Sequence, residues 1–374
     1  MIDVDELGAW LQLQLAPGIG RESARRLLRA FGTPQGVVAA SRAALSEVIG
    51  PRQADAMARG AAPMPAALAA ARRWLEGGSD RHVLTLGDPA YPPALLHSPD
   101  PPLLLYVQGD PAALCAASIA VVGSRKPSAQ GLDNARHFAQ ALGEAGLVVV
   151  SGLALGIDAA AHEGALAGGA STIAVLGTGI DRIYPPRHAG LAARIAGQGA
   201  LVSEFVPGTA PLAENFPQRN RIIAGLALGT LVVEAALRSG SLITARLANE
   251  AGREVFALPG SIHAEQSRGC HALIREGARL VETPAEVLEE LRRPAAAAPA
   301  GASDPALPPD DEPPCEPSHE PVLEALGHDP IGLDSLQARC GWPTAELLAR
   351  LLELELAGHV VRLPGGLYQR RGRA

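Results

Sequence analysis

Apolar and polar positions follow two different rhythms along the central part of the chain. Short apolar runs end in glycine- or serine-rich loops, and stretches with helical spacing lie between them. The runs cover residues 118–125, 147–152, 171–177, 200–205, 230–235, 253–260 and 278–281. Because they do not alternate strictly, they are typical of strands buried on both faces. We therefore predict an α/β fold with a doubly wound parallel sheet.

Shorter patterns flank this region. LAPGIGRESARRLLRAF, near the start, is similar to a helix-hairpin-helix in which Gly18 and Gly20 turn backbone amides toward a phosphate. A helical corner without a ligand is the equal alternative. Residues 321–374 predict three helices and a hairpin at Gly365 and Gly366, which is a winged-helix pattern. Its helix from Thr344 has more glutamate than arginine, so a protein contact is as good an interpretation as DNA binding.

Proline marks a boundary between the sheet and the winged helix. Residues 293–320 contain eight prolines, six acidic residues and one arginine, which predicts a disordered acidic linker. The predicted domains are a helical domain of the SAM or helix-hairpin-helix type (1–75), the sheet domain (76–292), the linker (293–320) and the winged helix (321–374).

Composition narrows the class of protein. The chain of 374 residues is 47% hydrophobic and 19% charged, as is usual for a globular protein. No apolar run is long enough for a membrane helix, and the acidic N-terminus lacks the pattern of a signal peptide. The four cysteines form no C-x-x-C pair. They predict free thiols in a reducing, cytoplasmic setting rather than a zinc or disulfide framework.

The net charge of −7 does not exclude a nucleic-acid partner, because much of the acidity lies in the linker. The loops predicted at the carboxyl ends of the strands instead concentrate glycine, hydroxyl groups and cations, which suit a phosphate-binding edge. The first such loop holds Lys126, the only lysine of the chain. A solvated turn is the alternative. Candidate residues in these loops are Gly123, Ser124, Arg125, Lys126, Ser128, Gly152, Gly177, Thr178, Gly179 and Arg187.

FPQRNRIIAG (216–225) adds cations at the start of a predicted helix. Arg219 and Arg221 are two apart and therefore point to different sides, so one can face the strand-end edge while the other braces a neighbour. Phe216 offers a face on which an unstacked base could lie. The alternative is a structural pair of an arginine with Glu204 or Glu234.

Signals for cofactor chemistry or catalysis are weak. The loop at 123–128 is no G-x-G-x-x-G fingerprint, which argues against a nicotinamide or flavin cofactor. Asp158 and His162 share a helix face, but no third ligand has suitable spacing, so we expect no metal. Ser239-Gly240-Ser241 forms no nucleophile elbow. We therefore expect a protein that is not an enzyme.

Several long motifs occur together in order: VVGSRKPSAQG, VVSGLALGIDAAAH, TIAVLGTGIDRIYP, SEFVPG, NFPQRNRIIAG, VVEAALRSGSLITARLANEAGREVFALPG and GCHALIREGA. Over residues 85–292 the chain resembles the DNA-processing protein A family of bacteria, also called Smf. The resemblance implies an extended Rossmann-like domain that binds single-stranded DNA without hydrolysing it. It also implies a homodimer that loads the RecA recombinase past single-strand-binding protein during natural transformation.

The resemblance transfers site residues motif by motif. It assigns Arg125 to the pocket, and it adds Phe216, Arg219, Asn220 and Arg221 from one motif. Another motif supplies Ser239, Gly240, Ser241 and Thr244. Leu273 and Ile274 are dimer candidates by resemblance alone. His188 stands where many members have asparagine, which weakens that position.

An enzyme of the phosphoribohydrolase type, acting on nucleoside monophosphates, is the alternative function, since it shares the sheet and the phosphate loops. LRSGSLITARLANE lacks the glutamate spacing that such enzymes need. A protein-interaction scaffold is a third interpretation.

Overall fold

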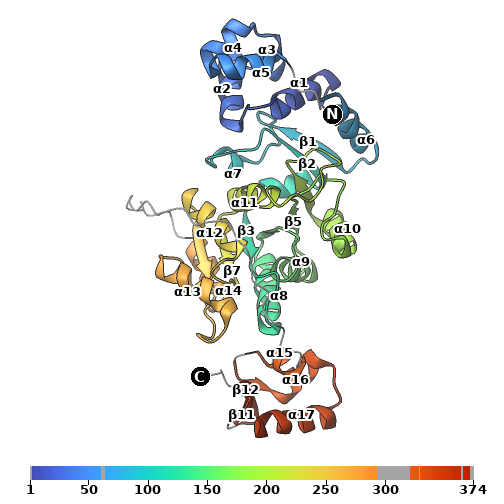
Figure 1. The fold of residues 1–374 in the computed structure, drawn as a ribbon. Coiled ribbons are helices and arrows are strands. Elements are labelled where there is room, and N and C mark those ends of the chain that lie inside the picture. Colours follow the sequence, from blue (N-terminus) through green and yellow to red (C-terminus); the bar gives the residue numbers. More distant parts are fainter. Residues whose placement is uncertain (1, 60–63, 293–320, 328, 364, 371–374) are drawn as a thin grey trace.

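The computed structural model describes residues 2–59, 64–292, 321–327, 329–363 and 365–370. A helical unit, a sheet domain and a winged helix follow one another from top to bottom in Figure 1. The predicted linker 293–320 lies outside the described residues. Within the described ranges, no helix combines the length and the apolar character needed to cross a bilayer.

In its described residues, 2–59 and 64–76, the N-terminal unit has six helices: α1 (Val4–Leu15), α2 (Arg21–Phe31), α3 (Pro34–Ala39), α4 (Arg42–Ile49), α5 (Pro51–Ala58) and α6 (Met64–Glu76). The hairpin between α1 and α2 turns at Gly18, whose φ of 73° favours glycine. Gln53 of α5 donates to the carbonyl of Gly18 at 2.9 Å and ties this hairpin to the next helix pair. The predicted helix-hairpin-helix is confirmed.

Nine strands form the central sheet: β1 (Arg81–Thr85), β2 (Leu104–Gly109), β3 (Ser118–Val122), β4 (Val148–Ser151), β5 (Thr172–Val175), β6 (Ala200–Ser203), β7 (Gly229–Val232), β8 (Glu254–Ala257) and β9 (Arg279–Leu280). Their order is β1-β2-β6-β5-β4-β3-β7-β8-β9. Strands β3 to β9 are parallel where they pair, as predicted. The antiparallel strands β1 and β2 extend one edge and were not predicted.

Helices cover both faces of the sheet (Figure 1). Helices α8 (Ala129–Glu144), α9 (Ile157–Ala167) and α14 (Pro284–Arg292) bury one face, where Ile119 and Val121 point into the core. Helices α11 (Asn215–Leu226), α12 (Gly240–Glu250) and α13 (Arg268–Arg275) bury the other. The remaining helical elements are α7 (Pro93–Leu96), η1 (Pro111–Cys115), η2 (Pro186–His188), α10 (Ala189–Gln198) and η3 (Glu265–Ser267). The doubly wound prediction is confirmed.

The strand order reverses between β3 and β7. From β3 the chain builds the sheet toward β6, and from β7 it builds toward β9 on the other side. Open α/β sheets bind ligands outside the carboxyl ends of their strands at such a point. The reversal therefore places the loop at 123–128 where a ligand site is expected.

The C-terminal region folds around a core of its own, as the winged-helix prediction requires. It consists of α15 (Pro321–Leu326), β10 (Ile331–Gly332), α16 (Leu333–Cys340), α17 (Thr344–Leu356), β11 (Val360–Leu363) and β12 (Leu367–Arg370). Arg339 reaches Asp133 of α8, with Nη2 3.0 Å from Oδ2, and so connects this region to the sheet domain.

Candidate nucleic-acid interface

The loops after β3, β4, β5 and β7 lie at one edge of the sheet because these strands are parallel. We call this edge the rim and define it as residues 123–128, 152–156, 177–188 and 234–241, together with Phe216 of α11. It brings together most of the residues predicted as a phosphate site.

Besides Arg182, Arg187 and Arg238, the rim exposes the cations Arg125 and Lys126, which share the loop after β3. Their loop is held by the hydroxyl of Ser124, which accepts from the amide of Lys126 at 3.0 Å. Among the described residues, neither cation forms an ion pair with a carboxylate. Both charges are therefore available to an anion from solution.

An aromatic pair lies beside these cations. The guanidinium carbon of Arg125 lies 5.7 Å from the centroid of the Phe216 ring, and the ring of Tyr184 lies 5.8 Å from that of Phe216. Gly177 makes room for this arrangement, since a Cβ there would lie 2.9 Å from Phe216. Tyr184 is 47% exposed and is a site candidate that the sequence analysis did not select. Its position before Pro185 in a glycine-rich loop was the available signal.

The reversal point between β3 and β7 already holds an anion from the chain itself. Glu234 accepts from the amide of Ser128 at 2.9 Å and from its hydroxyl at 2.5 Å, at the N-terminus of α8. Burial raises the pKa of Glu234, and the bonds from Ser128 oppose that rise. Gly131 admits the carboxylate, because a Cβ would lie 2.4 Å from it. A dinucleotide pyrophosphate would compete with Glu234 for this helix N-terminus.

Arg219 lies beneath the rim. It is 4% exposed, and its Nη1 donates to the carbonyl of Gly152 at 2.6 Å and to that of Val175. Asp158 lies nearby and accepts from the amides of Gly152 and Ala154. Burial raises the pKa of Asp158 against the pull of Arg219, and burial lowers the pKa of Arg219 to about 10. A charged Arg219 thus braces the ends of β4 and β5.

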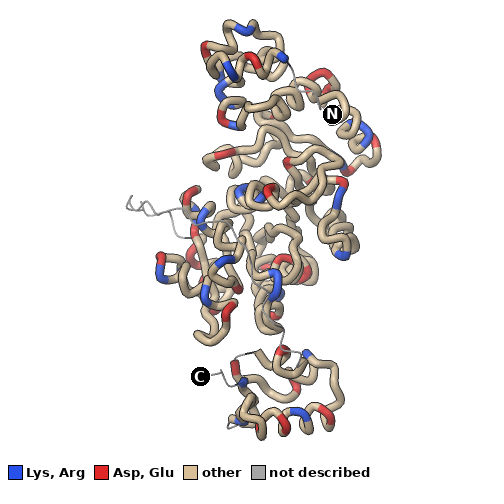
Figure 2. Tube along the Cα trace, viewed as in Figure 1, with Lys and Arg blue, Asp and Glu red and all other residues tan. Residues whose placement is uncertain are grey.

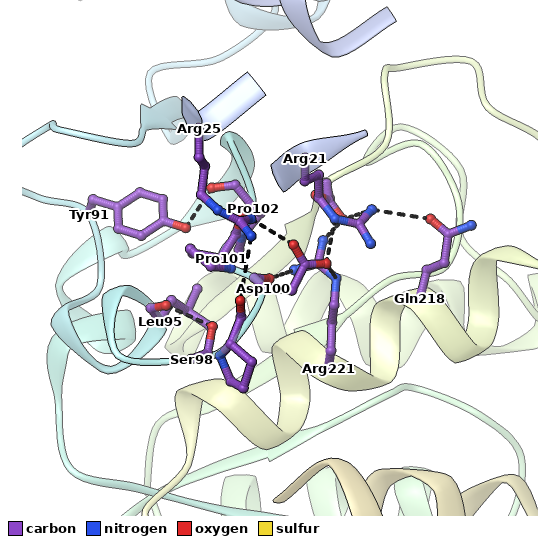
Figure 3. Close-up of polar contacts among 12 residues, drawn as sticks. Arg21, Arg25, Tyr91, Leu95, Ser98, Asp100, Pro101, Pro102, Gln218 and Arg221 are labelled. Carbon is purple, nitrogen blue, oxygen red and sulfur yellow. Dashed lines mark hydrogen bonds and ion pairs between the residues drawn. The ribbon is translucent and has the colours of Figure 1, made fainter. Parts of the chain in front are cut away.

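Arg221 reaches toward Asp100 and toward Arg21 of the N-terminal unit (Figure 3). It pairs with Glu204 and donates to the backbone carbonyl of Asp100. The Asp100 carboxylate also accepts from Arg21 at 2.6 Å and Arg25 at 2.7 Å. Burial alone would raise the pKa of Asp100, but these arginines outweigh it and lower the pKa below its usual value. Neither Arg219 nor Arg221 is exposed at the rim, and Arg221 forms the structural pair with Glu204 that was the alternative.

Several other predicted residues serve local structure. Ser239 caps α12 and its hydroxyl lies 2.7 Å from that of Ser241, while Thr244 is buried in the same helix. Asn220 donates to the carbonyl of Gly240 at 3.4 Å and joins α11 to α12. Thr178 and Gly179 are buried in their loop, and Arg187 is exposed. His188 contacts the carbonyl of Leu153 at 2.9 Å.

Two further groups of candidates lie apart from the rim cations. Leu273 is buried in the core of the sheet domain and Ile274 packs against that core, so the dimer role of both stays a prediction. His162 bonds to Thr172 at 2.8 Å. Within the described ranges, no group of three or more His, Cys, Asp or Glu side chains is arranged as a metal site.

Comparison with known proteins decides the family. Residues 82–292, more than half of the chain, match the family model described as DNA recombination-mediator protein A. The chain belongs to this family. The flanking regions match a DprA winged helix domain over residues 294–366 and a SAM-like helix-hairpin-helix tandem over residues 11–62.

Relatives from two bacteria share much of the chain. Protein Smf of Escherichia coli is 47% identical over 80% of this chain and 79% of its own length. The DNA processing protein DprA of Streptococcus pneumoniae is 50% identical over 54% of this chain and 72% of its own length. The likeness to Smf therefore extends beyond the sheet domain.

Solved structures of family members have the same fold. DNA processing protein A of S. pneumoniae is 38% identical, with a TM-score of 0.67 over 77% of this chain and 98% of that one. The protein from Helicobacter pylori, whose structure concerns a single-stranded DNA binding mode, is 30% identical with a TM-score of 0.52, over 56% of this chain and 95% of that one. The family therefore includes a member with this fold that binds single-stranded DNA.

Proposed function

We propose that this recombination mediator binds single-stranded DNA along the rim, without catalysing a reaction on it. The observation that carries the proposal is the set of Arg125, Lys126, Phe216 and Tyr184, in which exposed cations adjoin aromatic rings. Backbone phosphates suit the cations, and an unpaired base suits a ring face. A duplex keeps its bases stacked inside and would lose the second contact. The rim thus favours a single strand over a duplex.

The rim residues divide the work. Arg125 and Lys126 neutralise phosphates, Arg187 extends the positive path, and the loop 123–128 supplies close backbone approach. Arg219 acts as a positioning residue: it fixes the carbonyls of Gly152 and Val175 beneath the bound DNA strand. The remaining candidates, Asn220, Arg221, Ser239, Gly240, Ser241 and Thr244, hold α11 and α12 against the rim.

We further propose that a homodimer of this protein presents the bound strand to the RecA recombinase and helps it past single-strand-binding protein in the cytoplasm. Natural transformation and DNA recombination are the processes this activity serves. Membership in the recombination-mediator family supports this part of the proposal.

Fluorescence anisotropy of a labelled single strand of about 30 nucleotides, titrated at several salt concentrations, tests the binding step. Each phosphate neutralised on a single strand contributes a log–log salt slope of about −0.7. We expect preference over duplex and a loss of about tenfold or more for Arg125→Ala, since a charged contact is worth about 1.5–3 kcal/mol. Arg136→Ala is the matched control, because Arg136 lies on α8 and already pairs with Glu163.

Binding that Arg125→Ala leaves unchanged would overturn the rim as the DNA site. Release of free base from nucleoside monophosphates would instead favour the phosphoribohydrolase alternative. RecA filament assembly on strands coated with single-strand-binding protein tests the loading step. The wild-type protein should accelerate assembly, and the Arg125→Ala variant should not.

A further inference from the structure

Helix α17 has a second apolar face besides the one that it buries in the core of the winged helix. This second face carries a leucine at every fourth position, with exposed fractions of 40%, 56% and 81%: Leu348, Leu352 and Leu356. Residues four apart on a helix are neighbours, so these three side chains form one row about 12 Å long. We call them the leucine stripe. Single exposed leucines are common on protein surfaces, whereas a continuous apolar row indicates an interaction site.

The leucine stripe lies where a partner can reach it. Helix α17 packs against α15 and β11 of its own domain, and Figure 1 shows it along the edge of the winged helix that faces away from the sheet domain. The ion pair between Arg339 and Asp133 joins α16, not α17, to α8. A partner could therefore bind the stripe without displacing this contact between the domains.

Carboxylates border the leucine stripe on both sides. With 3.6 residues per turn, Glu355 projects along one border of the stripe, and Glu346 and Glu353 project along the other. Arg350 pairs with Glu353 and compensates part of this charge. Acidic residues still outnumber the one arginine of the helix (Figure 2). The stripe is thus an apolar row in an acidic surface.

The acidic borders distinguish between possible occupants. A second copy of α17 would bring carboxylates against carboxylates, and like charges at a contact are unfavourable. The phosphates of DNA and of anionic lipids would meet the same carboxylates, and helices that bind such membranes carry lysine and arginine around their apolar face. A helix with an apolar face between lysine or arginine residues is instead complementary to the stripe in both apolar character and charge.

We propose that the leucine stripe docks a basic amphipathic helix of another protein, one whose apolar face is bordered by lysine or arginine. A row about 12 Å long matches about three turns, or about 11 residues, of the partner helix. A contact of this size is at the lower end for specific protein interfaces, so we expect it to be reversible. The inference goes beyond DNA binding at the rim and does not depend on it.

A synthetic helix tests the proposal on the full-length protein. The probe is a labelled peptide of about 14 residues, or four turns, with leucine on one face and lysine along both borders. A second peptide has glutamate in place of each lysine. In fluorescence anisotropy titrations we expect the lysine peptide to bind at least tenfold more tightly than the glutamate peptide, because only the former complements the acidic borders.

Two leucine variants locate the binding site. Leu352→Gln removes the central apolar group of the stripe and should weaken binding of the lysine peptide about tenfold, as truncation of a central interface residue does. Leu96→Gln is the matched control, because Leu96 of α7 is 51% exposed, close to the 56% of Leu352, and lies outside the winged helix. It should bind the peptide as the wild-type protein does.

A charge reversal tests the acidic borders separately. The double variant Glu346→Lys with Glu355→Lys should reverse the preference, so that the glutamate peptide binds more tightly. Glu324→Lys with Asp334→Lys changes the net charge equally at exposed positions of α15 and α16, and it should keep the preference for the lysine peptide. Reversal by both double variants would show only general attraction between charges and would overturn the proposed site.

Other outcomes would also overturn the proposal. A lysine peptide that does not bind the wild-type protein, or that binds Leu352→Gln and Leu96→Gln equally, would remove the stripe as its docking site. Sedimentation velocity tests the alternative occupant: if Leu352→Gln alone converts dimers into monomers, the stripe binds a second copy of this chain. We expect both leucine variants to sediment as the wild-type protein does.

Discussion

The rim and the winged helix both belong to folds that can bind nucleic acid, yet their surfaces differ in chemistry. The rim presents Arg125 and Lys126 beside two aromatic rings. Helix α17, in the position of a recognition helix, carries Glu346, Glu353 and Glu355 against Arg350, and acidic residues predominate on it in Figure 2. A nucleic-acid role follows from the charges and rings that a fold exposes, not from the fold alone.

The exposed apolar residues sharpen the contrast. Leu348, Leu352 and Leu356 of α17 are 40%, 56% and 81% exposed, and their spacing of four places them along one stripe. At the rim, by comparison, the exposed large apolar groups are Leu237 and Tyr184, and the tyrosine ring can stack on a base. Leucine cannot stack in this way, so α17 is suited to a protein contact.

The largest expected effect concerns the buried charge beneath the rim. Arg219→Ala should lower the free energy of unfolding by about 3–5 kcal/mol, because Asp158 is left as a buried carboxylate without its cation. Arg350→Ala in α17 should cost about 0.5 kcal/mol, since its pair with Glu353 is on the surface. Urea denaturation measures both, and equal losses would contradict the contrast.

The next test concerns how the stability of the protein depends on pH. Burial, aided by the charges of Arg219 and His188, lowers the pKa of His162 from 6.5 to about 3. The unfolded state therefore binds a proton that the folded state rejects, and stability falls as pH drops from 6.5 toward 3. Between pH 7 and pH 5 this group should cost about 2 kcal/mol. His162→Gln should lack this part of the pH dependence in denaturation experiments, and an unchanged slope would count against it.

Single-strand affinity should depend on the rim ring more than on the leucine stripe. Phe216→Ala should weaken binding by about 1–3 kcal/mol, the usual worth of one stacked base. Leu352→Ala, which removes an exposed apolar group from α17, should leave anisotropy titrations unchanged. Comparable losses in the two variants would assign DNA contact to the winged helix as well.

The smallest effect is expected from removing the winged helix altogether. A chain ending at residue 292 should bind single strands within about twofold of the full chain at physiological salt, because exposed charges are screened over about 8 Å. A parallel salt titration should give the same slope. A shallower salt dependence in the shortened chain would show that DNA phosphates also contact the winged helix in the full chain.

Much of the fold could be predicted because it depends on patterns local in sequence. Strands β3 to β9 each coincide with an apolar run, and the glycine-rich loops predict the edge where they end. Strands β1 and β2 were missed because they pair antiparallel at the sheet edge and do not follow the βαβ rhythm. Their register depends on tertiary pairing with β6.

The candidate site was predicted less completely, for a reason that Arg219 illustrates. Its partners are backbone carbonyls 44 and 67 residues earlier in the chain, and no pattern of side chains in the sequence predicts such contacts. Arg125 and Lys126 were easier, because a strand end and a short cationic loop define them locally. The pair of Arg221 with Glu204 was foreseen only as one of two possibilities.

The antiparallel pairing of β2 with β6 affects where the sheet domain can be cut. β2 covers Ala200–Ser203, matching Tyr106 to Ser203 and Gly109 to Ala200. A fragment beginning after Cys115 would leave β6 as an open edge with unpaired amides and carbonyls. Such edges recruit other strands and drive self-association. Strands β1 and β2 thus protect the edge of the sheet domain. A fragment that keeps both strands should stay monodisperse under conditions in which the fragment beginning after Cys115 aggregates.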